Sequence, residues 1–339
     1  MPGFILIGCG NIAQKHITQI QLTGKLVAIH DTDQQKVNQL SHQLDVPGFA
    51  SFDDLMKSGL HAEIMVICSP NGLHAEQSIM ALNKGYHVLC EKPMALKSED
   101  GMAMLNAAKQ ANRLLVIVKQ NRFNPPIQRL KHWIESGASG QLYSYSLNCL
   151  WNRNPEYYTS SLWRGTLEMD GGTLYTQFSH YIDFLYWLFG KPREVHGFRT
   201  NLAHQDIIQF EDQGTVSLAY ANGLIGGIHY SINSFEKNME SSLTILAQHG
   251  SIRIGGPSCN NIEYQCIKND YWQMGEDPPD TNRYGSYTGS MSNHHQVYKQ
   301  FIHALGQEQY NYQGAFEAMK TVELIEEIYR QSSLVIRHS

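Results

Sequence analysis

A lysine stands where a buried strand is expected to end, in the stretch Glu91-Lys92-Pro93. The apolar run Val88–Cys90 before it predicts a core strand, and the proline restricts the backbone directly after the lysine. Partial burial lowers the pKa of an amine and brings it towards the range that is useful for proton transfer. The alternative is a lysine that reaches from a strand end into solvent and has no chemical role.

A histidine on a helix predicted from Gly172 to Phe189 is the second candidate for proton transfer. Thr176, His180 and Asp183 are spaced i, i+4 and i+7, so they share one face of this helix. The imidazole of His180 can accept a proton near neutral pH. The alternative is a histidine that serves only the fold.

A glycine-rich turn, Gly8-Cys9-Gly10-Asn11-Ile12-Ala13, follows the first apolar run of the chain. In the G-x-G-x-x-A pattern the first glycine permits a tight turn and the second lets the backbone approach a pyrophosphate. The helix that follows offers N–H groups and a partial positive charge to the phosphates. We therefore expect Gly8, Gly10, Asn11 and Ile12 to bind a dinucleotide; the alternative is a simple tight turn.

An aspartate, Asp31, ends the second expected strand, about 20 residues after the glycine turn. A carboxylate at this place accepts hydrogen bonds from the ribose hydroxyls and repels the 2′-phosphate of NADP. The next residues, Thr32 and Asp33, offer no arginine that could bind such a phosphate. The sequence therefore favours NAD as the cofactor.

The elements that must position these residues change in type near residue 120. Before it, apolar strands alternate with helices that begin near Asn11, Asp33, Gly72 and Ser98. The expected strands are Phe4–Ile7, Leu26–His30, Ile64–Cys68, Val88–Cys90 and Leu114–Val118. This alternation predicts an α/β Rossmann domain over residues 1–120, with a doubly wound parallel sheet. The carboxyl edge of such a sheet binds ligands, and there we expect Ser69, Pro70, Asn71, His74 and Glu91 to contribute to the cofactor site.

Residues 121–339 predict an α+β domain with a large open antiparallel sheet. Its expected strands are Leu142–Leu150, Thr215–Tyr220, Leu224–Ile232, Ser242–Leu246 and Ser251–Ile254. Besides the helix that carries His180, helices are expected over residues 124–136, 293–305 and 315–331. The segment 268–291, rich in Asp, Pro, Gly, Ser and Tyr, predicts a long loop.

Composition limits the classes of partner. A net charge of −5 over 339 residues speaks against nucleic acid or an anionic membrane as the main partner. No apolar run approaches the roughly 20 residues that span a bilayer. The six cysteines include no Cys-x-x-Cys pair, which is typical of reduced thiols in a cytoplasmic protein. The histidines are scattered, so no structural metal site is expected.

These motifs together resemble the Gfo/Idh/MocA family of NAD(P)-dependent sugar oxidoreductases. The matching stretches are GCGNIA (8–13), CSPNGLH (68–74), CEKP (90–93) and GGTLYTQFSHYIDFLYWL (171–188). The resemblance implies that Lys92 lies beside the nicotinamide and the reacting hydroxyl, and that His180 is the catalytic histidine. Many relatives carry an aspartate where this chain has Thr176, which puts a simple acid-assisted triad in doubt. The family also pairs its sheets face to face, which implies a homo-oligomer, a dimer or a tetramer.

Four longer stretches are most similar to the WlbA-type branch, which oxidises the 3-hydroxyl of UDP-N-acetylglucosaminuronate on the way to bacterial surface polysaccharides. They are VKQNRFNPP (118–126), WNRNPEYY (151–158), residues 163–190 and SLTILAQHGSIRIGG (242–256). This branch tolerates a non-acidic residue at the Thr176 position. A UDP-uronate carries a diphosphate and a carboxylate, and Lys119, Arg122, Arg153 and Arg164 are cations in these stretches.

The expected substrate site combines residues of both domains. Its members are Lys92, Asn121, Arg122, Asn124, Thr176, Gln177 and His180. Three further residues, Gln120, Trp163 and Arg164, are expected at the cofactor. Two alternatives stay open: a dehydrogenase of the same family that acts on another sugar or an inositol-like polyol, and a non-catalytic NAD-sensing regulator. A regulator would be expected to lose Lys92 or His180, and the chain has both.

Overall fold

The computed structural model describes residues 1–273, 281–284 and 287–335, which divide into two compact units. The first unit combines Met1–Val118 with His294–Val322, and the second combines Lys119–Asn293 with Glu323–Ser339. The predicted change of domain at residue 120 lies within two residues of this division. The predicted assignment of all later residues to the second domain differs from it, because helix α10 (His294–Leu305) packs against α1 (Ala13–Thr23) in the first unit.

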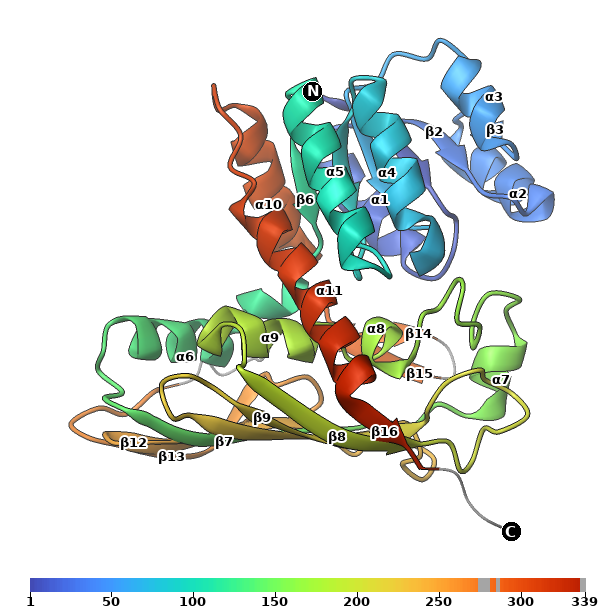
Figure 1. The fold of residues 1–339 in the computed structure, drawn as a ribbon. Helices are drawn as coiled ribbons and strands as arrows, with labels where there is room; N and C mark the ends of the chain where they lie inside the picture. The colour runs from blue at the N-terminus through green and yellow to red at the C-terminus, as the bar shows by residue number, and fades with distance from the viewer. Residues whose placement is uncertain (274–280, 285–286, 336–339) are drawn as a thin grey trace. The chain divides into compact units, whose positions relative to one another are not determined.

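The first unit is built on a six-stranded parallel sheet with helices packed against it (Figure 1). The strand order is β3-β2-β1-β4-β5-β6, and every neighbouring pair is parallel. The strands are β1 (Gly3–Ile7), β2 (Lys25–His30), β3 (Gly48–Phe49), β4 (Ile64–Ile67), β5 (His87–Cys90) and β6 (Leu115–Ile117). The strand order changes direction next to β1, because the chain adds β2 and β3 on one side of it and β4, β5 and β6 on the other. Open sheets of this kind bind their ligands at this point.

Helices of the first unit follow the strands in alternation. They are α1, α2 (Gln34–Leu44), α3 (Phe52–Lys57), α4 (His74–Asn83), α5 (Ser98–Ala111) and α10, with a single 3₁₀ turn η1 (Asn71–Leu73) before α4. The long helix α11 (Gln313–Gln331) contributes residues to both units. All five residues of β1 are buried, as expected for a central strand covered on both faces. The prediction of a doubly wound α/β domain is confirmed.

The second unit is built on an eight-stranded sheet of order β13-β12-β11-β7-β10-β9-β8-β16. Its strands are β7 (Leu142–Leu150), β8 (Glu194–Thr200), β9 (Gln213–Ala219), β10 (Ile225–Ser231), β11 (Glu240–Ala247), β12 (Gly250–Gly255), β13 (Asn261–Ile267) and β16 (Ser332–Leu334). The pairs β7–β10 and β8–β16 are parallel and the others antiparallel. The sheet is therefore mixed, although largely antiparallel as predicted.

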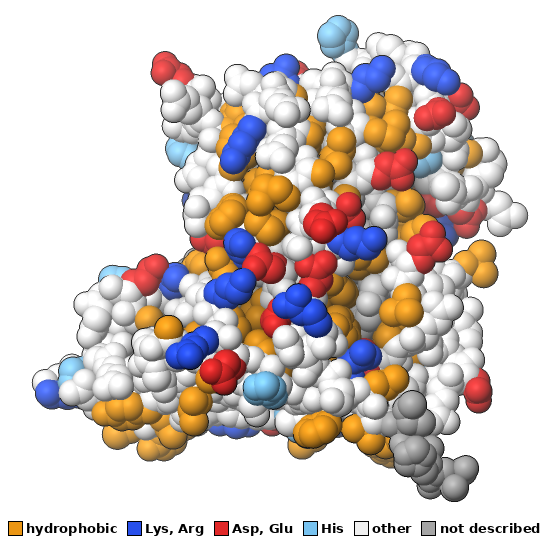
Figure 2. Space-filling model, in the orientation of Figure 1, with side chains coloured by type: hydrophobic (Ala, Val, Ile, Leu, Met, Phe, Trp, Pro, Cys, Tyr) orange, Lys and Arg blue, Asp and Glu red, His pale blue; other side chains and the backbone are white. Residues whose placement is uncertain are grey.

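Helices cover one face of this sheet (Figure 1). The helices of this unit are the 3₁₀ turn η2 (Gln120–Phe123), α6 (Pro125–Glu135), α7 (Pro155–Thr159), α8 (Thr173–Thr176) and α9 (Ser179–Phe189). Strand β9 shows the resulting alternation, because Val216 and Leu218 are buried while Thr215 and Ser217 are exposed. Figure 2 shows hydrophobic side chains along the edge of the molecule where strands of this sheet run.

Two elements predicted from the sequence differ in detail from the observed structure. The helix predicted from Gly172 to Phe189 is two helices, α8 and α9, because Gln177 and Phe178 interrupt it. The predicted loop over residues 268–291 contains a small hairpin, β14 (Thr281–Tyr284) with β15 (Tyr287–Met291). Residues 274–280 and 285–286 of that prediction lie outside the described residues. Among the residues that the structure describes, no helix has the length and apolar character to cross a bilayer.

Candidate active site

The glycine turn has the geometry that a dinucleotide requires. Gly8 has a φ of 93°, and a Cβ there would lie 2.5 Å from the carbonyl oxygen of Cys68, so only glycine fits. Its N–H donates to the carbonyl of His30 at 2.7 Å, which ties the turn to the end of β2. A Cβ on Gly10 would meet nothing within 4 Å, so the backbone there is open to a pyrophosphate.

Asp31 is fixed beside this turn. One carboxylate oxygen accepts the N–H of Cys9 at 2.7 Å and the other accepts the N–H of Asp33 at 2.9 Å. The hydrogen bonds hold the carboxylate next to the glycine turn, where the adenosine ribose of a bound dinucleotide lies in folds of this type. Residues 8–13 and Asp31 therefore fit NAD.

The ends of β4 and β5 are joined through a buried histidine. The ring of His74 lies between two carbonyl oxygens, that of Pro93 at 2.7 Å from Nδ1 and that of Ser69 at 2.9 Å from Nε2. Burial lowers the pKa of His74. Lys92, half-buried, precedes Pro93 directly, and the peptide bond between them is cis. The predicted cofactor residues Ser69, His74 and Lys92 thus lie together at the sheet edge of the first unit.

In the second unit a buried aspartate binds two cations. Asp183 accepts from Lys119 Nζ at 2.5 Å and from Arg122 at 2.6 Å (Nε) and 2.8 Å (Nη2). Burial alone would raise the pKa of Asp183, but Arg122 and Lys119 outweigh burial and hold the pKa well below its ordinary value. The guanidinium of Arg122 also lies over the ring of Trp187, 4.7 Å from its centroid.

The turn η2 contains a buried side-chain amide that is suited to bind a ligand. Asn121 is 0% exposed, and within the described part of the chain neither polar atom of its side chain has a hydrogen-bond partner. A buried polar side chain normally has such partners, so this amide is suited to bind a polar group of a ligand. Gln120, beside it, is also buried. Asn124 differs, because its amide donates to the Ser258 carbonyl at 2.8 Å and accepts from Asn293 at 2.9 Å.

A carboxylate not predicted from the sequence lies next to Thr176. The hydroxyl of Thr176 donates to Asp170, both to its carbonyl at 3.1 Å and to its carboxylate oxygen Oδ1. The second oxygen of Asp170, which is fully buried, accepts the N–H of Gly165 at 2.8 Å. Although Thr176 itself is not acidic, an acidic group is therefore bound to it, four residues before the buried His180.

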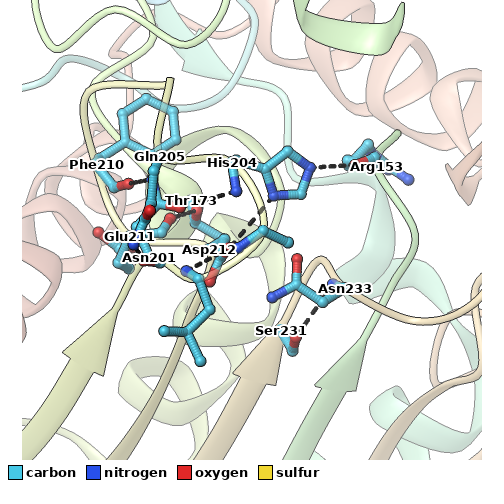
Figure 3. Close-up of polar contacts among 12 residues, drawn as sticks. Arg153, Thr173, Asn201, His204, Gln205, Phe210, Glu211, Asp212, Ser231 and Asn233 are labelled. Atoms are coloured by element: carbon cyan, nitrogen blue, oxygen red, sulfur yellow. Dashed lines mark hydrogen bonds and ion pairs between the residues drawn. The ribbon is translucent and has the colours of Figure 1, made fainter. Parts of the chain in front are cut away.

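Gln177 belongs to a buried network, and Figure 3 shows the part of this network around Arg153 and His204. Arg153 donates to Gln177 Oε1 at 2.7 Å, and Gln177 Nε2 donates to the Tyr157 hydroxyl at 2.9 Å. His204 lies between the Arg153 carbonyl at 2.8 Å and Asp212 at 3.3 Å (Figure 3). Contact of Gln177 with substrate stays a prediction, since both its polar groups are bonded within the unit.

Trp163 and Arg164, predicted at the cofactor, lie in the segment between α7 and α8. The guanidinium of Arg164 stacks on the ring of Tyr157, 4.2 Å from its centroid, and donates to the Tyr157 carbonyl at 3.1 Å. Both residues are half-buried, and their role at the cofactor stays a prediction.

Two family descriptions match this chain. Residues 3–119 match "Oxidoreductase family, NAD-binding Rossmann fold" and residues 127–253 match "GFO/IDH/MocA C-terminal domain", which together are well over half of the sequence. The chain belongs to the Gfo/Idh/MocA oxidoreductase family. The resemblance inferred from the motifs is thereby confirmed, and the first unit is the family's NAD-binding domain.

Similar solved structures extend over nearly the whole chain. The WlbA dehydrogenase from Bordetella pertussis, solved with NADH and UDP-GlcNAcA, is 33% identical with a TM-score of 0.85, and the match covers 97% of this chain and 96% of that one. The WlbA enzyme from Chromobacterium violaceum, with the same two ligands, is 34% identical with a TM-score of 0.86 and coverage of 97% and 93%.

Among curated relatives, the 1-carboxy-3-chloro-3,4-dihydroxycyclohexa-1,5-diene dehydrogenase of Comamonas testosteroni is 30% identical over 225 residues. This match covers 61% of the present chain and 53% of the relative. A levoglucosan dehydrogenase of Pseudarthrobacter phenanthrenivorans is 27% identical, with 54% of its length matched. The chain thus spans about half the length of these relatives, and their substrates differ from one another.

Proposed function

We propose that this chain is an NAD-dependent dehydrogenase that oxidises the 3-hydroxyl of UDP-N-acetylglucosaminuronate. The observation that carries this proposal is the match to two WlbA dehydrogenases bound to UDP-GlcNAcA, at 33% and 34% identity over 97% of the chain. The buried Asn121 amide suits the acetamide of this substrate. Lys119 and Arg122 share the single carboxylate of Asp183, so these three side chains together carry one net positive charge, which suits an anionic substrate.

The reaction removes a hydride from the sugar carbon and a proton from its hydroxyl. Bound NAD supplies the hydride acceptor. In this proposal His180 accepts the hydroxyl proton, and Lys92 donates a hydrogen bond to the same oxygen and relays the proton. Asp170, through Thr176, supplies near His180 the negative charge that favours a protonated imidazole. The chain's departure from the family at Thr176 is therefore compensated by a residue six positions earlier in the chain.

A substrate comparison tests the proposal. Purified protein with NAD is offered UDP-N-acetylglucosaminuronate, myo-inositol and free hexoses, and the absorbance of NADH is followed. We expect the highest kcat/KM with the nucleotide sugar. Faster oxidation of inositol or of a free hexose would contradict the nucleotide sugar as substrate and support another substrate within the family. NAD binding without oxidation of any of these compounds would favour a non-catalytic regulator.

Substitution of the two proposed catalytic residues tests the mechanism. Lys92→Ala and His180→Ala should each lower kcat by about 10² to 10⁴ while NAD affinity stays near that of the wild type, because neither residue builds the phosphate site. If the two act as one relay, the double variant should be little worse than either single one. Near-normal kcat in a single variant would exclude that residue from the mechanism.

We further propose that the uncovered face of the eight-stranded sheet pairs with a second copy of the chain. Phe198, Ile225, Leu246 and Tyr264 are 65%, 59%, 45% and 56% exposed on its strands, so this face is apolar in part. A monomer by light scattering at micromolar concentration would contradict this. All six cysteines are free thiols, which supports a cytoplasmic location as part of the proposal.

A further inference from the structure

A buried cluster of two histidines and one glutamate lies at the end of β5, next to Lys92. The carboxylate oxygen Oε1 of Glu91 forms hydrogen bonds with His16 Nε2 at 2.9 Å and with His294 Nε2 at 3.4 Å. The other oxygen, Oε2, accepts the backbone N–H of Lys92 at 3.1 Å. The exposed fractions of His16, Glu91 and His294 are 0%, 6% and 2%. All of them belong to the first unit.

The cluster connects three elements that are far apart in the sequence. His16 lies on α1, the helix that follows the glycine turn, and His294 is the first residue of α10. On its other side, His16 Nδ1 bonds the hydroxyl of the buried Tyr298, also on α10, at 2.9 Å. The imidazoles of His16 and His294 meet edge to face with centroids 5.3 Å apart. The carboxylate that bonds the Lys92 backbone is therefore held from two helices.

The carboxylate of this cluster is ionised. Burial alone would raise the pKa of Glu91, but the hydrogen bonds from His16 and His294 outweigh burial, so the pKa lies well below its ordinary value. Burial lowers the pKa of His16 and keeps that ring neutral, with Tyr298 donating to Nδ1 and His16 Nε2 donating to Glu91. The titratable groups that face Glu91 from the surrounding elements are His16, Cys68, His74, Cys90, Lys92, His294 and Tyr298.

Two histidines and a glutamate are also ligands that zinc accepts. The direct contact of 2.9 Å between His16 Nε2 and Glu91 Oε1 is a hydrogen bond, which requires the proton that a metal would displace. Glu91 Oε2 is bonded to the Lys92 N–H. The geometry therefore favours a hydrogen-bonded cluster, and metal content becomes an outcome of the test.

We propose that Glu91 is a positioning residue for Lys92, with His16 and His294 as the groups that hold its carboxylate. This inference rests on the proposed function, in which Lys92 contacts the reacting hydroxyl. The carboxylate fixes the backbone of Lys92 at the strand end and keeps one negative charge on the residue directly before Lys92. A nearby negative charge favours the protonated amine, which donates the hydrogen bond that the hydroxyl oxygen needs.

Glu91→Gln tests the proposal, because it removes the charge and preserves the volume. We expect kcat to fall by about 10- to 100-fold, since small errors in the position of a reacting group have effects of this order. The loss in kcat should exceed any loss in NAD affinity, because the Glu91 carboxylate bonds His16, His294 and the Lys92 N–H and lies outside the glycine turn expected to hold the phosphates. Tyr298→Phe, which frees the far side of His16, should lower kcat less. Its matched control is Tyr312→Phe, which removes a hydroxyl bonded to the Ala108 and Arg113 carbonyls in the same unit and should leave kcat unchanged.

A second measurement separates this inference from the proposed function. The rate at which acetic anhydride modifies Lys92 is measured against pH by mass spectrometry, in wild type and in Glu91→Gln. The midpoint should shift down by about one pH unit in the variant. This shift in a protein that oxidises no sugar would overturn the proposed function and support the effect of Glu91 on Lys92.

Three results would overturn the inference. They are an unshifted midpoint, an equal loss of kcat in Tyr298→Phe and Tyr312→Phe, and one equivalent of zinc in the purified wild type by elemental analysis. If Glu91→Gln fails to fold, the comparison of Tyr298→Phe with Tyr312→Phe still decides the question.

Discussion

Removal of the charge on Asp183 is predicted to destabilise the second unit strongly. Asp183→Asn leaves Lys119 and Arg122 without their carboxylate, although both side chains are only 12% exposed. Loss of one partner of a buried ion pair costs about 3–5 kcal/mol, because the remaining charge is buried without compensation. For a unit of this size each kcal/mol lowers Tm by about 2–4 °C, so a decrease of roughly 10 °C is expected.

The acid dependence of this effect has a definite sign. The pKa of Asp183 is lower in the folded state than in the unfolded chain, where it is about 4. The charged carboxylate therefore stabilises the fold above pH 4, and this contribution is lost as the pH falls further towards the folded pKa. The difference in Tm between wild type and Asp183→Asn should be constant from pH 5 to 8 and should shrink below pH 4.

Differential scanning calorimetry across this pH range is the assay. The matched control is Glu323→Gln, which breaks an ion pair with Lys191 of similar length, 2.7 Å, between side chains that are 67% and 29% exposed. Exposed pairs contribute about 0–1 kcal/mol, so this Tm should change by no more than a few degrees. Equal Tm changes in Asp183→Asn and Glu323→Gln would refute the argument that burial makes the Asp183 pairs important.

Three further predictions concern other carboxylates. Asp31→Ser should weaken NAD binding and relatively favour NADP, as measured by kcat/KM with each cofactor; equal use of both by the wild type would contradict the role given to Asp31. Asp170→Asn should lower kcat by about tenfold or more with little change in the KM for NAD, and an unchanged kcat would remove Asp170 from the mechanism. Burial raises the pKa of Glu211 to about 7, so wild type should lose stability as the pH rises from 5 to 8, by about 3 kcal/mol in total, and Glu211→Gln should not show this loss in chemical denaturation.

Much of the Rossmann domain could be predicted because its signals are local. Apolar runs such as Leu26–His30 correspond to the observed strand Lys25–His30 within one residue, and helix α5 begins at Ser98 as expected. Such runs are buried on both faces, so their composition alone marks them. Strand β8 was missed, because Glu194–Thr200 has one buried residue, Val195, and mixes charged and small residues. Its pairing with β9 and β16 depends on residues that are distant in sequence.

Long-range pairings also explain which parts of the candidate site were missed. Asp170 was not predicted because its bond to Thr176 depends on the turn at Gly171 and Gly172, both with positive φ. His294 lies about 200 residues from Glu91, and no spacing rule relates the two. By contrast, Asp183 could be identified as a member of the His180 helix face, although its two cationic partners could not.

The acidic residue that the family usually places at the Thr176 position illustrates how a site tolerates substitution. A histidine base requires a negative charge within a few ångströms more than it requires that charge at a given position in the sequence. Here the carboxylate of Asp170, fully buried and fixed by the Gly165 N–H, reaches Thr176 through a hydrogen bond. A double-mutant cycle tests whether Asp170 acts on catalysis through the Thr176 hydroxyl or serves only the turn. If Asp170 acts through the hydroxyl, Asp170→Asn should lower kcat much less in a Thr176→Val background than in wild type. If Thr176→Asp restores kcat to Asp170→Asn, the two positions supply the same charge; additive losses without such rescue would show that Asp170 serves only the turn.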